Sequence, residues 1–161
     1  MSGNKRLDNV APVVHAVKSR ERPTNSLLDD DNEDLLDARE VFDYIRDIND
    51  PEHPYTLEQL NVVDEDLIKV DLTDHGMPVV DVNFTPTIPH CSLAALIGLS
   101  IVIKLHRSLA DNVKMRVRIT PGSHSTEEAI NRQLADKERV AAALENPSVM
   151  SAVNRCLKPP E

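Results

Sequence analysis

The chain has 161 residues, which is enough for one domain with a substantial core and too few for two comfortable ones. Its 18 basic and 27 acidic residues give a formal net charge of −9, which argues against non-specific binding to nucleic acid or anionic lipid. A basic surface is therefore the better expectation for a partner. The most apolar stretch, residues 93–103, is too short to span a bilayer and predicts a core helix.

Cys91 and Cys156 are the two cysteines, and no CxxC spacing or disulfide framework is visible. The N-terminal residues lack the long apolar run of a secretory signal. We therefore expect the protein in the cytosol, and in the nucleus as well, where thiols stay reduced.

Residues 1–33 mix Asn, Ser, Pro and scattered charges and run into the acidic stretch 29–34, so we expect a disordered N-terminal extension. The folded domain is expected over residues 34–161. It begins with an amphipathic helix over 34–48, because apolar residues recur there every three or four positions. Pro51 ends that helix and opens a rigid loop.

Two strands are expected next, over residues 67–72 and 78–85, because apolar and polar residues alternate in both. The turn between them, residues 73–76, predicts a hairpin. A helix over 92–109 follows, and then a strand over 113–119 whose outward side chains are Lys114, Arg116 and Arg118.

One further helix is expected over about 125–145, and a last short helix follows Pro147. The order α-β-β-α-β-α predicts a single α+β domain, with helices packed on one face of a small, mostly antiparallel sheet.

Cys91 is the sharpest candidate for chemistry. It lies where a turn braced by Pro86 and Pro89 meets the first turn of a helix, a position that favours the thiolate. His90 could act as a second ligand, a proton acceptor or a positive neighbour. The alternative is that Cys91 is a small buried hydrophobic residue. One thiol cannot hold an iron–sulfur cluster alone, because clusters usually take four thiolates.

The loop after the first helix is the second candidate. Asp50, Glu52 and His53 could approach a metal or Cys91 if this loop folds back toward the Cys91 turn. Taken alone, the sequence favours the alternative, in which Asp50 and Pro51 end the helix and the other two face water. Enzyme signatures such as a phosphate loop or a GxSxG elbow are absent, so we expect no enzyme activity.

Three stretches together resemble the eukaryotic branch of the DUF-fifty-nine (MIP-eighteen-like) family: residues 48–60, 85–92 and 119–124. The resemblance covers about residues 34–161. It implies that the family's reactive cysteine is Cys91, which is also a candidate metal ligand, and that its acidic motif is Asp50 and Glu52. Thr87 and His90, in the same stretch as the cysteine, are further candidate supporting residues.

Within the family, both ends of the chain resemble the small, galla-type subunit of the cytosolic iron–sulfur assembly targeting complex. The resemblance implies a WD40 propeller subunit and a HEAT-repeat adaptor as partners, with delivery of clusters to cytosolic and nuclear apoproteins. It also implies a link to chromosome segregation through a spindle-associated complex. No stably bound cofactor is expected, although a cluster could pass through transiently.

Two further possibilities remain open. The chain could be a purely structural interaction module that docks a partner through Lys114, Arg116 and Arg118, with Cys91 serving only packing. It could also form a homodimer, because a small sheet has edge strands to cover, by strand pairing or by exchange of a helix.

Overall fold

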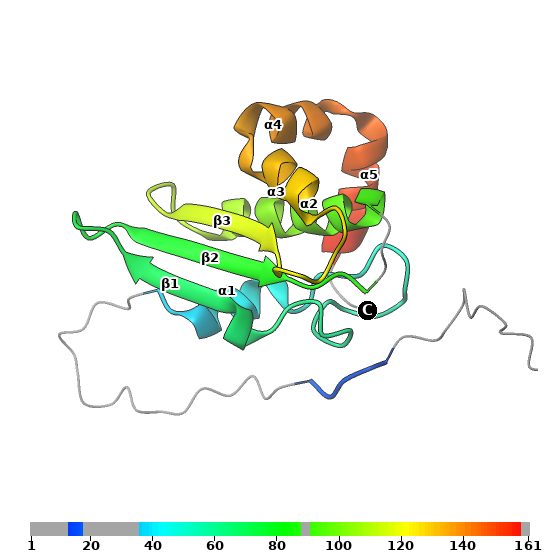
Figure 1. Ribbon diagram of the computed structural model, residues 1–161, viewed down its shortest axis with the longest axis horizontal. Helices are drawn as coiled ribbons and strands as arrows, with labels where there is room; N and C mark the ends of the chain where they lie inside the picture. The colour runs from blue at the N-terminus through cyan, green and yellow to red at the C-terminus, as the bar shows by residue number, and fades with distance from the viewer. Residues whose placement is uncertain (1–12, 18–35, 88–90, 159–161) are drawn as a thin grey trace, which may run out of the picture.

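A computed structural model describes residues 13–17, 36–87 and 91–158, and the side chains of Cys91 and Ser92 are outside this description. The elements in chain order are α1 (Ala38–Ile45), the short 3-10 helix η2 (Glu65–Leu67), β1 (Ile68–Leu72), β2 (Pro78–Phe84), α2 (Cys91–Ser108), β3 (Lys114–Ile119), α3 (Glu127–Ala135), α4 (Lys137–Glu145) and α5 (Pro147–Leu157) (Figure 1). This order confirms the predicted α+β domain.

The sheet has the strand order β1-β2-β3. β1 and β2 form the expected antiparallel hairpin, in which Gly76 provides the left-handed turn residue (φ 77°). β2 and β3 are parallel. The prediction of a mostly antiparallel sheet is therefore correct for the hairpin only, because α2 crosses over and returns the chain to run alongside β2.

The helices cover one face of the sheet, as predicted. On that face Val80, Val82 and Phe84 of β2 and Val117 and Ile119 of β3 are buried. Figure 1 shows α1 and α2 against the sheet, with α3, α4 and α5 grouped beyond β3.

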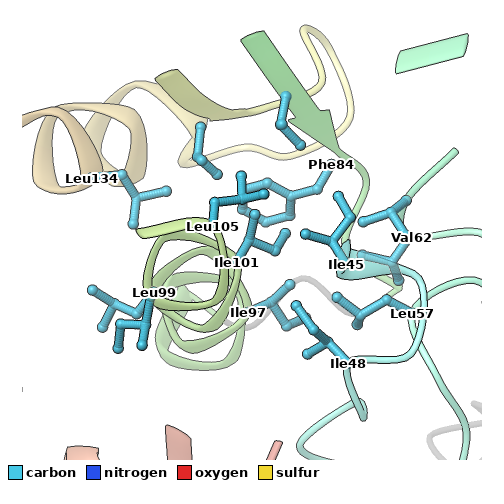
Figure 2. Close-up of a cluster of buried hydrophobic side chains, with 14 of the residues drawn as sticks. Ile45, Ile48, Leu57, Val62, Phe84, Ile97, Leu99, Ile101, Leu105 and Leu134 are labelled. Carbon is cyan, nitrogen blue, oxygen red and sulfur yellow. The ribbon is translucent and has the colours of Figure 1, made fainter. Parts of the chain in front are cut away.

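α2 is the centre of the core. Figure 2 shows Ile97 and Ile101 of this helix directed toward Ile45 and Leu57, which come from α1 and the loop after it. Gly98 lets α2 approach α3 closely, since a Cβ atom there would lie 2.5 Å from Leu134 Cδ1. Burial of these aliphatic side chains supplies the main driving force for folding.

Three helix boundaries differ from expectation. α1 ends at Ile45 and not at 48, so Pro51 does not end it. α1 begins at Ala38 and not at 34, because the Asp37 carboxylate accepts the Glu40 N–H (2.7 Å) as an N-cap. The helix predicted over 125–145 is broken at Asp136, whose carboxylate accepts the N–H groups of Glu138 (3.0 Å) and Arg139 (3.3 Å). Asp136 thereby starts α4 in a new direction.

A buried ion pair joins α1 to the loop that follows it. Arg46, fully buried, donates through Nε to Glu58 Oε1 (3.1 Å) and through Nη2 to Glu58 Oε2 (2.7 Å). Its Nη1 donates to Asp43 (2.7 Å), and its guanidinium lies 4.7 Å from the centre of the Phe42 ring. Burial lowers the pKa of Arg46, but the hydrogen bonds and the attraction of the two carboxylates outweigh it and raise the pKa overall.

Part of the predicted N-terminal extension is described. In residues 13–17, Val13, Val14 and Val17 are exposed, and the His15 N–H donates to the Gln59 carbonyl (2.6 Å). The rest of the extension, apart from these five positions, lies outside the described residues.

Candidate functional site

The loop between α1 and η2 is closed by backbone bonds and fixed to the far end of the chain. Asn49 pairs with Thr56, and the Asp50 N–H donates to the Tyr55 carbonyl (2.9 Å). The Asn49 N–H donates to the Cys156 carbonyl (2.8 Å), and its side-chain amide donates to the Lys158 carbonyl (2.9 Å). The last turn of α5 therefore holds this loop in place.

Asp50 organises the turn itself. Its side chain is 7% exposed, and its Oδ1 accepts the N–H groups of Glu52 (2.8 Å) and His53 (3.0 Å). A carboxylate that accepts two amides in this way stabilises a turn much as an N-cap stabilises a helix start. Glu52, in contrast, is exposed.

Asp50→Ala is expected to loosen this turn and to lower the free energy of unfolding by about 1–2 kcal/mol, the usual loss when a capping side chain is removed. Amide hydrogen exchange should be faster at Glu52 and His53 while the core of α2 stays protected. Asp50→Asn keeps an acceptor oxygen and is the matched control. Equal exchange in Asp50→Ala and the wild type would contradict this role.

A small cavity of about 10 Å³ lies where three segments meet: the loop between α1 and η2, the residues after β2 and the start of α2. This is about the room that one water molecule needs. Its lining residues are Asp50, Pro51, Glu52, Pro86, Thr87, Leu93, Ala94 and Ile97. The loop therefore does fold back toward the head of α2. The alternative, in which Asp50 and Pro51 only end the helix, is wrong, because α1 already ends at Ile45 and both residues line this cavity. Glu52 is exposed, as that alternative expected.

Cys91 is the first residue of α2, one residue before the predicted start of this helix, so it does lie where the turn meets the first turn of the helix. The first-turn N–H groups of a helix have no partner within the helix, and its dipole is positive at this end. Both effects favour a thiolate there. His90 lies outside the described residues, and so does the side chain of Cys91, whose role stays a prediction.

Thus the structure brings Asp50, Glu52 and Thr87 together beside the helix that Cys91 begins. The apolar wall of the cavity was not predicted from the sequence. Leu93 and Ile97 are four residues apart and share one face of α2, a spacing that could have indicated this wall.

Cys156 serves packing. It is buried at 3% exposure, and burial raises the pKa of its thiol, while a hydrogen bond with Ser100 acts in the opposite direction. Ser100 follows Cys91 by nine residues, or about 13.5 Å along the axis of α2 at 1.5 Å per residue. Cys156 therefore lies beside the middle of α2, stays protonated near neutral pH, and is a poor metal ligand.

The predicted basic face is on the side of the sheet away from the helices. Lys114, Arg116 and Arg118 are exposed there. Asp81 of β2 lies between the two arginines, with its Oδ1 at 3.4 Å from Arg116 Nε and 3.5 Å from Arg118 Nη2. One carboxylate thus offsets part of this positive charge.

Within residues 13–17, 36–87 and 91–158, no group of three His, Cys, Asp or Glu side chains is placed to hold a metal ion. None of the helices in the same ranges is long and apolar enough to cross a membrane.

Comparison with known proteins gives a consistent result. The sequence profile of the family described as "Iron-sulfur cluster assembly protein" matches residues 38–119. An MIP18 family protein of Caenorhabditis elegans is 64% identical over 160 residues, covering 99% of both chains. "Cytosolic iron-sulfur assembly component 2B" of Mus musculus is 55% identical, covering 97% of this chain and 94% of its own, and "MIP18 family protein galla-2" of Drosophila melanogaster is 53% identical, covering 94% and 95%.

Proposed function

This chain belongs to the MIP18 family of iron–sulfur cluster assembly proteins, and from that premise we propose that it serves cytosolic iron–sulfur cluster assembly as an adaptor without enzyme activity. The observation that carries the proposal is the meeting of Asp50, Glu52 and Thr87 beside the helix that begins at Cys91. A thiolate at that position is a soft ligand of the kind that iron–sulfur clusters require.

The role of Cys91 is to hold a cluster transiently during transfer. One thiolate leaves most ligand positions of a cluster to another molecule, so the cluster is shared with a donor, a client or a second subunit. The exposed Glu52 and the buried, hydrogen-bonded Asp50 shape the surface on which such a molecule rests.

The chain works as the small subunit of a targeting complex, with a WD40 propeller subunit and a HEAT-repeat adaptor as partners. The complex delivers clusters to apoproteins in the cytosol and the nucleus, and through a spindle-associated complex it contributes to chromosome segregation. A net charge of −9 supports contacts with proteins and not with nucleic acid.

Anaerobic incubation with iron and sulfide tests the transient cluster. Wild type and Cys156→Ser should develop the absorbance of thiolate-bound iron–sulfur clusters, and Cys91→Ser should not. Equal absorbance in Cys91→Ser and the wild type would exclude Cys91 as the ligand.

A second candidate function rests on the exposed arginines of β3. If this face docks an acidic patch of the propeller subunit, Arg116→Glu should slow their association on the order of tenfold, because it places a like charge opposite that patch. Surface plasmon resonance at fixed ionic strength measures this rate.

Arg132→Glu, the same change of charge at an exposed position of α3, is the matched control. If Arg116→Glu abolishes both binding and client maturation while Cys91→Ser leaves both intact, the chain is an interaction module with no thiol chemistry. Equal association rates for Arg116→Glu and Arg132→Glu would remove the β3 face from the interface.

A further inference from the structure

The two edges of the sheet differ in whether their outward backbone groups have a partner. At the β3 edge, α3 supplies a partner, because the Ile119 N–H donates to Asn131 Oδ1 (2.8 Å). At the other edge β1 is the outermost strand (Figure 1), and within the described residues no strand pairs with its outer side. Lys69 and Asp71 are exposed there. Leu72 is 55% exposed, and among the described residues it is the one large apolar strand side chain that is exposed.

The hairpin bonds show which backbone groups of β1 face outward. The Thr73 N–H donates to Met77 (2.8 Å), so Lys69 and Asp71, at alternate positions before it, bond inward to β2. Leu72 lies opposite Pro78, which has no N–H group. This agrees with an alternation in which the Leu72–Pro78 pair exchanges no backbone hydrogen bonds. Val70 and Leu72 therefore direct both N–H and C=O to the free edge.

The sequence of β1, Ile-Lys-Val-Asp-Leu, is self-complementary about Val70. We propose that β1 pairs antiparallel with β1 of a second copy of this chain, with the two-fold axis at Val70. Lys69 of each copy then lies opposite Asp71 of the other, and Ile68 lies opposite Leu72. The two Val70 residues exchange backbone hydrogen bonds, and each Leu72 N–H donates to the Ile68 carbonyl of the other copy.

Charge selects this register. Because only Ile68, Val70 and Leu72 face outward, neighbouring registers that preserve hydrogen bonding differ by two residues. One of these slips places Lys69 opposite Lys69, and the other places Asp71 opposite Asp71. Directly opposed like charges are destabilising, so the centred register is the one in which both pairs attract.

In this pairing, residues directly opposite each other lie on the same side of the sheet. The two three-stranded sheets become one continuous sheet with the helices of both copies on one face and both basic faces on the other. The pairing covers the exposed Leu72. A contact between two short strands is small, so the dimer is weak and depends on concentration. This inference goes beyond the proposed function and does not depend on Cys91.

A charge swap on the full-length chain tests the register. Sedimentation equilibrium up to about 1 mM should show a reversible dimer for the wild type. Lys69→Asp should raise the dissociation constant on the order of tenfold, because each substitution counts twice in a symmetric pair. Lys69→Asp combined with Asp71→Lys restores both attractive pairs and the wild-type net charge, so it should restore the dimer.

Lys114→Asp makes the same change of net charge on β3 and controls for general repulsion. Amide exchange of Val70 and Leu72 should slow as the dimer fraction rises. A monomer at every concentration would overturn the proposal, and so would failure of the double variant to dimerise while its circular dichroism stays native. A dimer in which the Val70 amide exchanges freely would also overturn it, because the two copies would then associate through another surface. So would a monomer in which the Val70 amide is protected at all concentrations, because the β1 edge would then be covered by another segment of the same chain.

Discussion

Arg46→Ala is expected to lower the free energy of unfolding by about 3–5 kcal/mol, because it leaves the Glu58 carboxylate buried without its counter-charge. Arg46 is fully buried and Glu58 is 6% exposed, so neither charge has water as a substitute partner. The substitution also removes the cation–π contact with Phe42. Urea denaturation followed by circular dichroism measures the loss.

Two variants separate this effect from general damage. Arg39→Ala removes the more exposed contact with Glu65 (3.2 Å; 23% and 33% exposed) and should cost less than about 1 kcal/mol. Arg46→Met combined with Glu58→Leu removes both charges and should recover most of the lost stability. If Arg46→Ala costs no more than Arg39→Ala, the buried pair does not hold the loop as we infer.

Patterns confined to neighbouring residues predicted much of the fold. Alternation placed the strands within about one residue of their observed ends, and the apolar run at 93–103 lies within α2. The parallel pairing of β2 with β3 could not be read in the same way, because no local pattern states the direction of a neighbouring strand. Asp136 was overlooked as a helix start because the apolar spacing continues across it.

The site could be predicted only where it depends on residues that are neighbours in the sequence. The prolines before Cys91 mark a helix start, which is a local feature. The burial of Asp50 depends on contacts with α2 and on a loop fixed to Cys156 and Lys158, more than a hundred residues later. Likewise, nothing in the spacing of Arg46 and Glu58 distinguishes a buried pair from two solvated charges.

Cys91→Ser is expected to lower the iron loaded into client iron–sulfur proteins by at least about tenfold. Loss of a residue that only supports a metal ligand usually lowers metal affinity or activity by about 10–100-fold, and loss of the ligand itself should have a larger effect. A serine hydroxyl stays protonated near neutral pH and is a poor ligand for iron in a cluster. The change is small, so thermal unfolding should match the wild type. Cys156→Ser removes the other thiol and controls for loss of a cysteine as such.

The most direct test is radiolabelled iron recovered with an immunoprecipitated client enzyme, in cells whose only copy of this chain is wild type, Cys91→Ser or Cys156→Ser. At equal levels of each variant, we expect normal labelling with Cys156→Ser and strongly reduced labelling with Cys91→Ser. Normal labelling with Cys91→Ser would exclude a role of Cys91 in cluster transfer and leave the start of α2 as a packing element.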